Sequence, residues 1–155
     1  MAETETETRT EGGWDADAAK NWEEQLIADM RAHGGRPSGG PLAGQALILL
    51  FTKGARTGQA RRSILTASRD GDAWVVAGTA SGAPKHPAWL FNVEADPNVT
   101  VEADNEEFPA TATVEREGPE RDRLWANHVQ QLPHFAEYPK QVGGRTIPMV
   151  RLIRR

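Results

Sequence analysis

Long apolar runs and period-two alternation dominate the pattern of apolar and polar positions along this chain, and such a pattern is typical of strands. Residues 46–52 form a continuous apolar run, which predicts a strand covered on both faces. Residues 62–69 and 73–79 predict two more strands. Asp70-Gly71-Asp72 lies between them and predicts a hairpin turn.

Two later segments alternate between apolar and polar side chains, at residues 99–103 and 108–114. They predict a second hairpin with one face in water, and residues 147–153 predict a last strand. The sequence therefore predicts about six antiparallel strands. Because closure removes free sheet edges, this pattern favours a mainly β (α+β) domain built on a small antiparallel barrel.

Helical periodicity appears in three stretches. Trp22, Leu26 and Met30 recur four residues apart, which predicts a helix capped by Asp15 or Asp17 and ending near His33. The same reasoning predicts two short peripheral helices, over residues 88–95 and from residue 118 onward.

Composition and charge narrow the function. We expect one domain over residues 14–155 and a disordered acidic tail over residues 1–13, which are rich in Glu and Thr. The first thirty residues hold nine acidic and two basic side chains, and the rest hold thirteen acidic and sixteen basic ones. A mildly basic body with one dense basic cluster favours a small anionic ligand over a nucleic acid.

Several classes of protein are disfavoured. The chain has no cysteine, which excludes disulfides, thiolate metal sites and a cysteine nucleophile. No histidine pair has zinc-ligand spacing, so no metal is expected. We find no signal-peptide pattern and no apolar run that could span a bilayer, and we expect a cytoplasmic protein.

The segment 53–62, Lys-Gly-Ala-Arg-Thr-Gly-Gln-Ala-Arg-Arg, carries the clearest functional signal. Four of its ten residues are basic and two are glycine. Guanidinium forks match phosphate geometry, and glycine lets the main chain approach a ligand closely. We interpret it as a phosphate-binding turn, although a solvated hairpin loop has the same composition.

Small residues follow the strand over residues 77–82, and a basic, proline-flanked segment comes next. The small residues offer either a tight turn or a surface on which a flavin-like ring can lie against the backbone. Lys85 could reach an anion, whereas His86 alone is typical of a surface or capping histidine. Trp89 is either a wall for the ring or a core side chain.

These features include no evident acid, base or nucleophile. They suit a reaction whose chemistry a bound cofactor supplies, and hydride transfer is such a reaction.

The motifs from Lys53 to Arg61 and from Val76 to Trp89, with Asn92, Pro97 and the last strand, closely resemble the deazaflavin-dependent nitroreductase family of actinobacteria. The resemblance covers roughly residues 47–152. It implies a split β-barrel related to FMN-binding barrels. It also implies reduced coenzyme F420 as the cofactor, a deazaflavin with a phosphate and a polyglutamate tail.

Carried over by position, the resemblance implies three groups of cofactor-binding residues. The phosphate and linker would contact Ala55, Arg56, Thr57, Gly58, Arg61, Ser63, Ile64, Leu65 and Thr66. The ring would lie against Ala77, Gly78, Thr79 and Ala80, and the pocket would be completed by Ala88, Trp89, Leu90, Phe91 and Asn92. On charge alone we add Lys53, Arg62 and Lys85 as candidates for the anionic parts of the cofactor.

The substrate side departs from the family's pattern. Leu132 and Phe135 stand where a well-known member has tyrosines, and only Tyr138 keeps its hydroxyl. Tyr138 is therefore the candidate catalytic residue on that side. Loss of hydroxyl partners weakens binding of a polar nitro compound, whereas a flat quinone still fits.

We therefore expect an F420-dependent oxidoreductase that transfers hydride to a quinone-like or nitroaromatic acceptor. The alternatives are an FMN-binding split-barrel oxidoreductase and a non-catalytic F420-binding protein. The chain is expected to be a monomer or homodimer. We expect at most weak peripheral contact with the inner face of the membrane, because the acidic first helix lacks a long apolar face.

Overall fold

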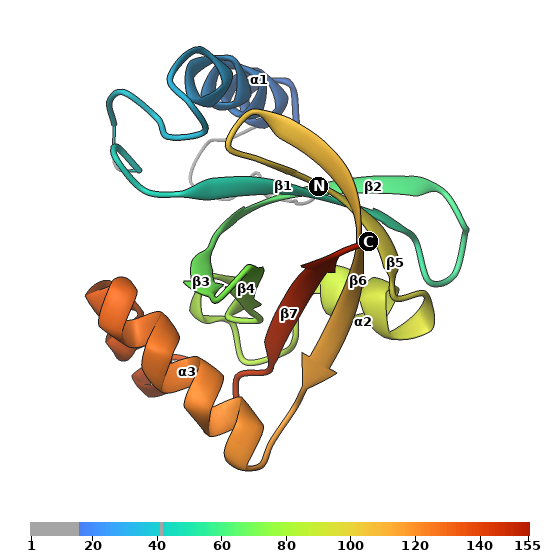
Figure 1. Cartoon of the computed structure of the whole chain (residues 1–155), viewed down its shortest axis with the longest axis vertical. Helices are drawn as coiled ribbons and strands as arrows, with labels where there is room; N and C mark the ends of the chain where they lie inside the picture. Colours follow the sequence, from blue (N-terminus) through green and yellow to red (C-terminus); the bar gives the residue numbers. More distant parts are fainter. Residues whose placement is uncertain (1–15, 41) are drawn as a thin grey trace.

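A computed structural model describes residues 16–40 and 42–155 (Figure 1). Its centre is one antiparallel sheet with the strand order β2-β1-β5-β6-β7-β4-β3. The strands are β1 (Leu47–Lys53), β2 (Ala60–Thr66), β3 (Ser68–Asp70), β4 (Ala73–Ala77), β5 (Asn98–Ala103), β6 (Glu106–Glu115) and β7 (Met149–Arg154).

The sheet curls on itself, and the connection between β2 and β3 shows why. These two strands lie at opposite ends of the strand order, yet only Ala67 separates them in sequence. The first and last strands must therefore come close, and Figure 1 shows β1 and β2 crossing above β3, β4 and β7. The predicted split β-barrel is confirmed, with β2 and β3 as its edges.

The helices are peripheral. They are α1 (Ala16–Ala32), α2 (Ala88–Ala95) and α3 (Pro119–Gln131), with short 3₁₀ segments η2 (Ala80–Gly82) and η3 (Pro133–Lys140). Helix α1 buries Ile27 and Met30 against Leu47 and Leu49 of β1, whereas Trp22 is 45% exposed. The face of α1 that contacts β1 therefore includes Met30 of the predicted apolar row but leaves Trp22 in solvent.

Strand β1 is covered on both faces, as its apolar run predicted. Ile48 and Leu50 lie in the interior of the barrel with Val76 and Leu152, while Leu47 and Leu49 pack under α1. An ion pair also connects α1 to the sheet, because the Arg31 guanidinium donates to both carboxylate oxygens of Glu102 on β5 at 2.7 and 2.8 Å.

Several sequence predictions need correction. The strand predicted over residues 62–69 divides at Ala67, whose amide donates to Ala46 O at 2.9 Å, so the described chain has seven strands rather than six. The last strand starts at Met149 rather than residue 147, and the strand predicted over residues 73–79 ends at Ala77. Segment η3 was not predicted, and the tail predicted over residues 1–13 lies outside the described residues.

Two further observations concern the described residues alone. They contain no helix with both the length and the apolar character of a membrane span. They also bring together no group of three or more potential metal ligands.

Candidate functional site

The basic segment forms the turn between β1 and β2. The last paired residues are Lys53 and Ala60, so residues 54–59 make the turn. The Gly54 amide donates to Gln59 O at 2.7 Å, and the Gly58 amide donates to Gly54 O at 2.8 Å. Gly58 has φ of 71°, and a Cβ at Gly54 would lie 2.8 Å from Thr57 Oγ1. Both glycines are therefore needed for this tight turn.

Asn92 holds the turn against α2. Its Oδ1 accepts from the Ala55 amide at 2.9 Å, and its Nδ2 donates to Thr52 Oγ1 at 3.1 Å. The Asn92 side chain is buried, so these bonds are protected from water. Asn92, which was predicted to bind the cofactor, thus holds the turn in place through its buried side chain.

The turn presents positive charge and free amides. No described carboxylate forms an ion pair with Lys53, Arg56 or Arg61, and all three side chains are exposed. No described group accepts from the amides of Arg56 and Thr57. Unpaired cations beside unpaired backbone donors are the donor set that a phosphate group requires.

Arg61 and Arg62 point to opposite faces of β2. Arg61 pairs in register with Thr52, which lies on the α2 side, and its Nε is 3.8 Å from where a Gly54 Cβ would stand. Arg62 pairs in register with Phe51 and binds Glu23 of α1 at 3.3 Å. Directly opposed residues share a face of the sheet, so only Arg61 lies over the turn.

The other predicted residues of β2 follow the same alternation. Leu65 packs on the barrel interior, whereas Ile64 packs toward α1. Ser63 lies on the Leu65 face, and Thr66 donates to Gln45 Oε1 at 3.3 Å. Because β2 pairs only with β1 among the described strands, one row of its backbone groups is open to a ligand.

The small-residue segment is more enclosed than its composition indicates. Ala77, Gly78 and Thr79 are buried, and Gly78 donates to Pro148 O at 2.8 Å. Ala80 and Ser81 have φ of 49° and 55°, a strained region for residues with a Cβ. Such strain persists only where surrounding contacts hold the backbone in place.

Arg145 supplies those contacts, and it was not among the predicted site residues. Its guanidinium donates to the carbonyl oxygens of Gly78, Thr79 and Ala83 at 2.9–3.1 Å, and to His86 Nδ1 at 2.9 Å. No described carboxylate pairs with it, and burial lowers the pKa of Arg145. The only signal in the sequence was one arginine after Gly143-Gly144, just before the last strand.

The segment from Lys85 to Phe91 divides between surface and core. Trp89 is 8% exposed and Leu90 fully buried, both in the barrel interior, so the core alternative describes Trp89. Phe91 is 46% exposed. Lys85 and Ala88 are exposed as well, and no described carboxylate pairs with Lys85.

The predicted substrate residues gather at η3. The Phe135 ring is buried 5.2 Å from the Tyr138 ring, and Leu132 is half-buried in the same cluster. Behind them His128 is fully buried, bonded to Ser68 Oγ at 2.6 Å, with the Phe135 ring edge-on at 4.4 Å. Burial holds the pKa of His128 at about 4, with a smaller effect from His134.

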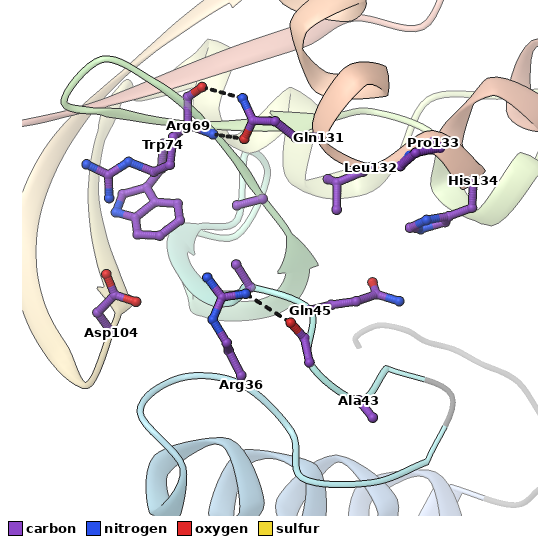
Figure 2. A pocket seen from close by; sticks show the side chains of 13 residues that line it. Arg36, Ala43, Gln45, Arg69, Trp74, Asp104, Gln131, Leu132, Pro133 and His134 are labelled. Carbon is purple, nitrogen blue, oxygen red and sulfur yellow. Dashed lines mark hydrogen bonds between the residues drawn. The ribbon is translucent and has the colours of Figure 1, made fainter.

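A hollow of about 570 Å³ opens beyond the far end of β2. Ala67 lies in its wall directly after β2, and the wall also includes Gln45. Figure 2 shows Leu132 and His134 approaching from the end of α3 and Arg36 from the opposite loop. The remaining wall includes Trp74, with the Arg69 guanidinium 4.1 Å from its ring centroid.

The turn and the hollow stand at opposite ends of β2. Seven residues of strand span about 20–24 Å. That distance suits an elongated ligand with an anionic end at the turn and a second, flat molecule in the hollow. The split barrel and this basic turn are typical of the class of protein that binds an elongated anionic cofactor.

The chain belongs to the F420H(2)-dependent quinone reductase family, whose sequence profile matches residues 22–153. This confirms the resemblance to a deazaflavin-dependent reductase family. The F420H(2)-dependent quinone reductase Rv1261c of Mycobacterium tuberculosis (strain ATCC 25618 / H37Rv) is 36% identical over 110 residues, which cover 70% of this chain and 73% of that protein.

Two solved structures are also similar. An F420-H2 dependent reductase (FDR-A) is 34% identical with a TM-score of 0.61, and the match covers 68% of this chain and 92% of that one. A domain-swapped dimer is 30% identical with a TM-score of 0.63, and the match covers 88% of this chain and 97% of that one.

Proposed function

We propose that this protein binds F420 along the open edge of β2 and transfers hydride from its reduced form to a quinone-like acceptor. The observation that carries the proposal is the β1–β2 turn, which carries Arg56, the unbonded amides of residues 56 and 57 and, beside it, Arg61, with no acidic partner among the described residues. Membership of the family supports the same cofactor and acceptor. The FMN alternative has no comparable support.

Different parts of the site bind different parts of the cofactor. Arg56, Arg61 and the amides of the turn bind the phosphate, and Lys53, which has no ion pair among the described residues, binds the polyglutamate tail of the cofactor. The open edge of β2 and the segment from Gly78 to Ala80 orient the ring. When bound, reduced F420 supplies the hydride, so the protein needs no nucleophile of its own.

The hollow at the end of β2 is the proposed acceptor site. Its wall combines apolar surface from Leu132 and Trp74 with donors from Arg36 and His134. Such a wall offers apolar contact to a flat ring and hydrogen bonds to quinone oxygens. Tyr138 packs against the same cluster as Leu132 but is not in the wall of the hollow, so its role as a catalytic group stays a prediction.

The decisive experiment is a fluorescence titration with oxidised F420. Arg61→Ala is expected to weaken binding roughly ten- to a hundredfold, since one charge-assisted contact contributes about 1.5–3 kcal/mol. Arg62→Ala is the matched control, because that neighbouring side chain faces α1 and should change affinity less than about threefold. Equal effects of both variants, or no binding by the wild type, would refute the proposed site.

Turnover tests the reaction separately from binding. Reduced F420 mixed with the protein and menadione should be oxidised faster than without the protein. Tight binding without turnover of any quinone or nitroaromatic compound would favour the non-catalytic alternative.

Location and assembly are parts of the same proposal. We propose a cytoplasmic protein with weak peripheral contact with the membrane, because a quinone acceptor is lipid-soluble. Sedimentation with liposomes and light scattering would measure membrane contact and the choice between monomer and homodimer.

A further inference from the structure

The contact between Arg145 and His86 fixes which ring nitrogen of His86 carries the proton. Arginine can only donate, so His86 Nδ1 must accept from the Arg145 guanidinium at 2.9 Å. The proton of the neutral imidazole is therefore on Nε2. Burial, then the positive charges of Arg145 and Arg116, lower the pKa of His86 and outweigh the opposing effect of Glu94. The ring is neutral at pH 7.

The Nε2–H group of His86 has no described acceptor. His86 is half-buried, and Nε2 is not among the fully enclosed polar atoms that lack a partner, so a ligand can reach it. The Arg145 charge behind the ring polarises this N–H toward the outside. A donor backed by an unneutralised guanidinium favours a negatively charged oxygen.

The position of His86 relates it to the phosphate-binding turn. His86 directly precedes Pro87, the N-cap of α2, while Asn92 on the same helix holds the turn through Ala55. Five residues from Pro87 to Asn92 rise about 8 Å along the helix axis. Figure 1 shows α2 beneath the β1–β2 side of the barrel, so one short helix connects the two groups.

Two neighbours of His86 complete this surface. The exposed Phe91 ring lies 6.2 Å from the imidazole, and the exposed Lys85 precedes it in sequence. This combination of an aromatic face, a lysine and a polarised N–H suits one end of an anionic, partly aromatic molecule.

We propose that His86 is a second anion-binding residue that donates from Nε2 to an oxygen of bound F420, with Arg145 as its positioning residue. The proposal rests on the proposed function, because it assumes the same cofactor. The oxygen belongs either to the phosphate and carboxylate tail or to the ring, and both are acceptors of the same chemistry.

Fluorescence titration of variants with oxidised F420 tests the contact. His86→Phe should bind about tenfold more weakly than the wild type. His86→Gln should stay within about threefold, because the amide can accept from Arg145 and donate outward in place of the imidazole. His33→Phe is the matched control, since His33 is exposed at the end of α1 and should leave affinity unchanged. Wild-type affinity in His86→Phe would overturn the proposal.

Titration with a shortened F420 that lacks the phosphate and tail separates the two sources of the oxygen. If the His86→Phe defect disappears with this compound, the oxygen belongs to the phosphate or tail. If the defect remains, the oxygen belongs to the ring. Either result supports the contact.

Proton–nitrogen NMR of the imidazoles reports which ring nitrogen of His86 is protonated. A variant that only lost stability would not change this tautomer. The free wild type should show His86 protonated on Nε2, and F420 should shift that resonance. Arg145→Met should allow the other tautomer and weaken F420 binding together. A His86 protonated on Nδ1, or a resonance that F420 leaves in place, would overturn the inference. Absence of F420 binding by the wild type would instead refute the proposed function on which it depends.

Discussion

His128 is a histidine whose side chain lies entirely in the interior of the protein. Its imidazole joins Ser68 of β3 to Phe135 of η3 and is fully buried. A charged imidazole in that place would lose its hydration without gaining a carboxylate partner among the described residues. The residue therefore works as a neutral polar link beneath the proposed acceptor side.

The protein should lose stability in acid through this residue. The pKa of His128 is about 4 in the folded chain and near 6.5 when unfolded, so the unfolded state binds the proton first as pH falls. Its contribution is complete above pH 6.5 and is lost on going down to pH 4, which amounts to about 3 kcal/mol. Urea unfolding at pH 7 and pH 4.5 would measure most of this change.

His128→Leu provides the comparison, because carboxylates such as Asp70 also lose their ion pairs at lower pH. The variant should be less stable at pH 7 by about 1–3 kcal/mol, since Ser68 Oγ loses its partner. Its stability should nevertheless fall less between pH 7 and pH 4.5 than that of the wild type. Equal falls in both proteins would show that His128 is not the titrating group.

At the scale of elements, α2 organises the proposed cofactor site. Its interior face fills the barrel with Trp89 and Leu90, and Asn92 holds the β1–β2 turn. The residues before its first turn reach Arg145 through His86. The helix is therefore both part of the core and the support of two anion-binding groups.

Loss of the Asn92 amide should loosen the turn. Asn92→Ala removes acceptors and donors from Ala55 and Thr52 and should cost about 1–3 kcal/mol of stability. Hydrogen exchange of the turn amides should accelerate, and F420 affinity should fall. Asn98→Ala is a suitable control, because Asn98 is exposed and its side chain bonds only to Asp96 among the described residues. Unchanged exchange in the turn would contradict the anchoring role.

Several elements of the fold were predicted correctly from the sequence. The turn at residues 54–59, the hairpin at Gly71 and helix α2 all depend on local signals, and each lies where the pattern indicated. Trp89 was ambiguous, because an apolar side chain in the first turn of a helix fits a core and a ligand wall equally well. Its place in the barrel interior required the tertiary structure.

At the scale of the whole molecule, the C-terminal strand completes the fold. Strand β7 lies between β6 and β4, so it joins the half of the sheet that carries β1 and β2 to the half that carries β3 and β4. Val150 and Leu152 face the same interior as Leu50 and Val76, whereas Met149 packs on the opposite face with Leu124 of α3. Closure of the barrel therefore depends on residues at the end of the chain.

Two neighbouring residues of β7 test this role. Leu152→Ala should destabilise the protein by about 2–5 kcal/mol, because its side chain is fully buried in the barrel interior. Ile153→Ala should cost less than about 1.5 kcal/mol, since that side chain points outward and is 39% exposed. Denaturant midpoints would report both values, and similar costs would contradict the assigned register.

The amino-acid sequence by itself determined the strand pattern, the turn positions and the basic turn of a cofactor-binding protein, because these depend on periodicity and on residue types close together in the chain. The tertiary structure decided which of Arg61 and Arg62 shares the sheet face of Thr52, how β2 and β3 close the barrel, and that Arg145 meets His86 across 59 residues. Contacts of that kind leave no local pattern, since they arise only when distant segments pack against one another.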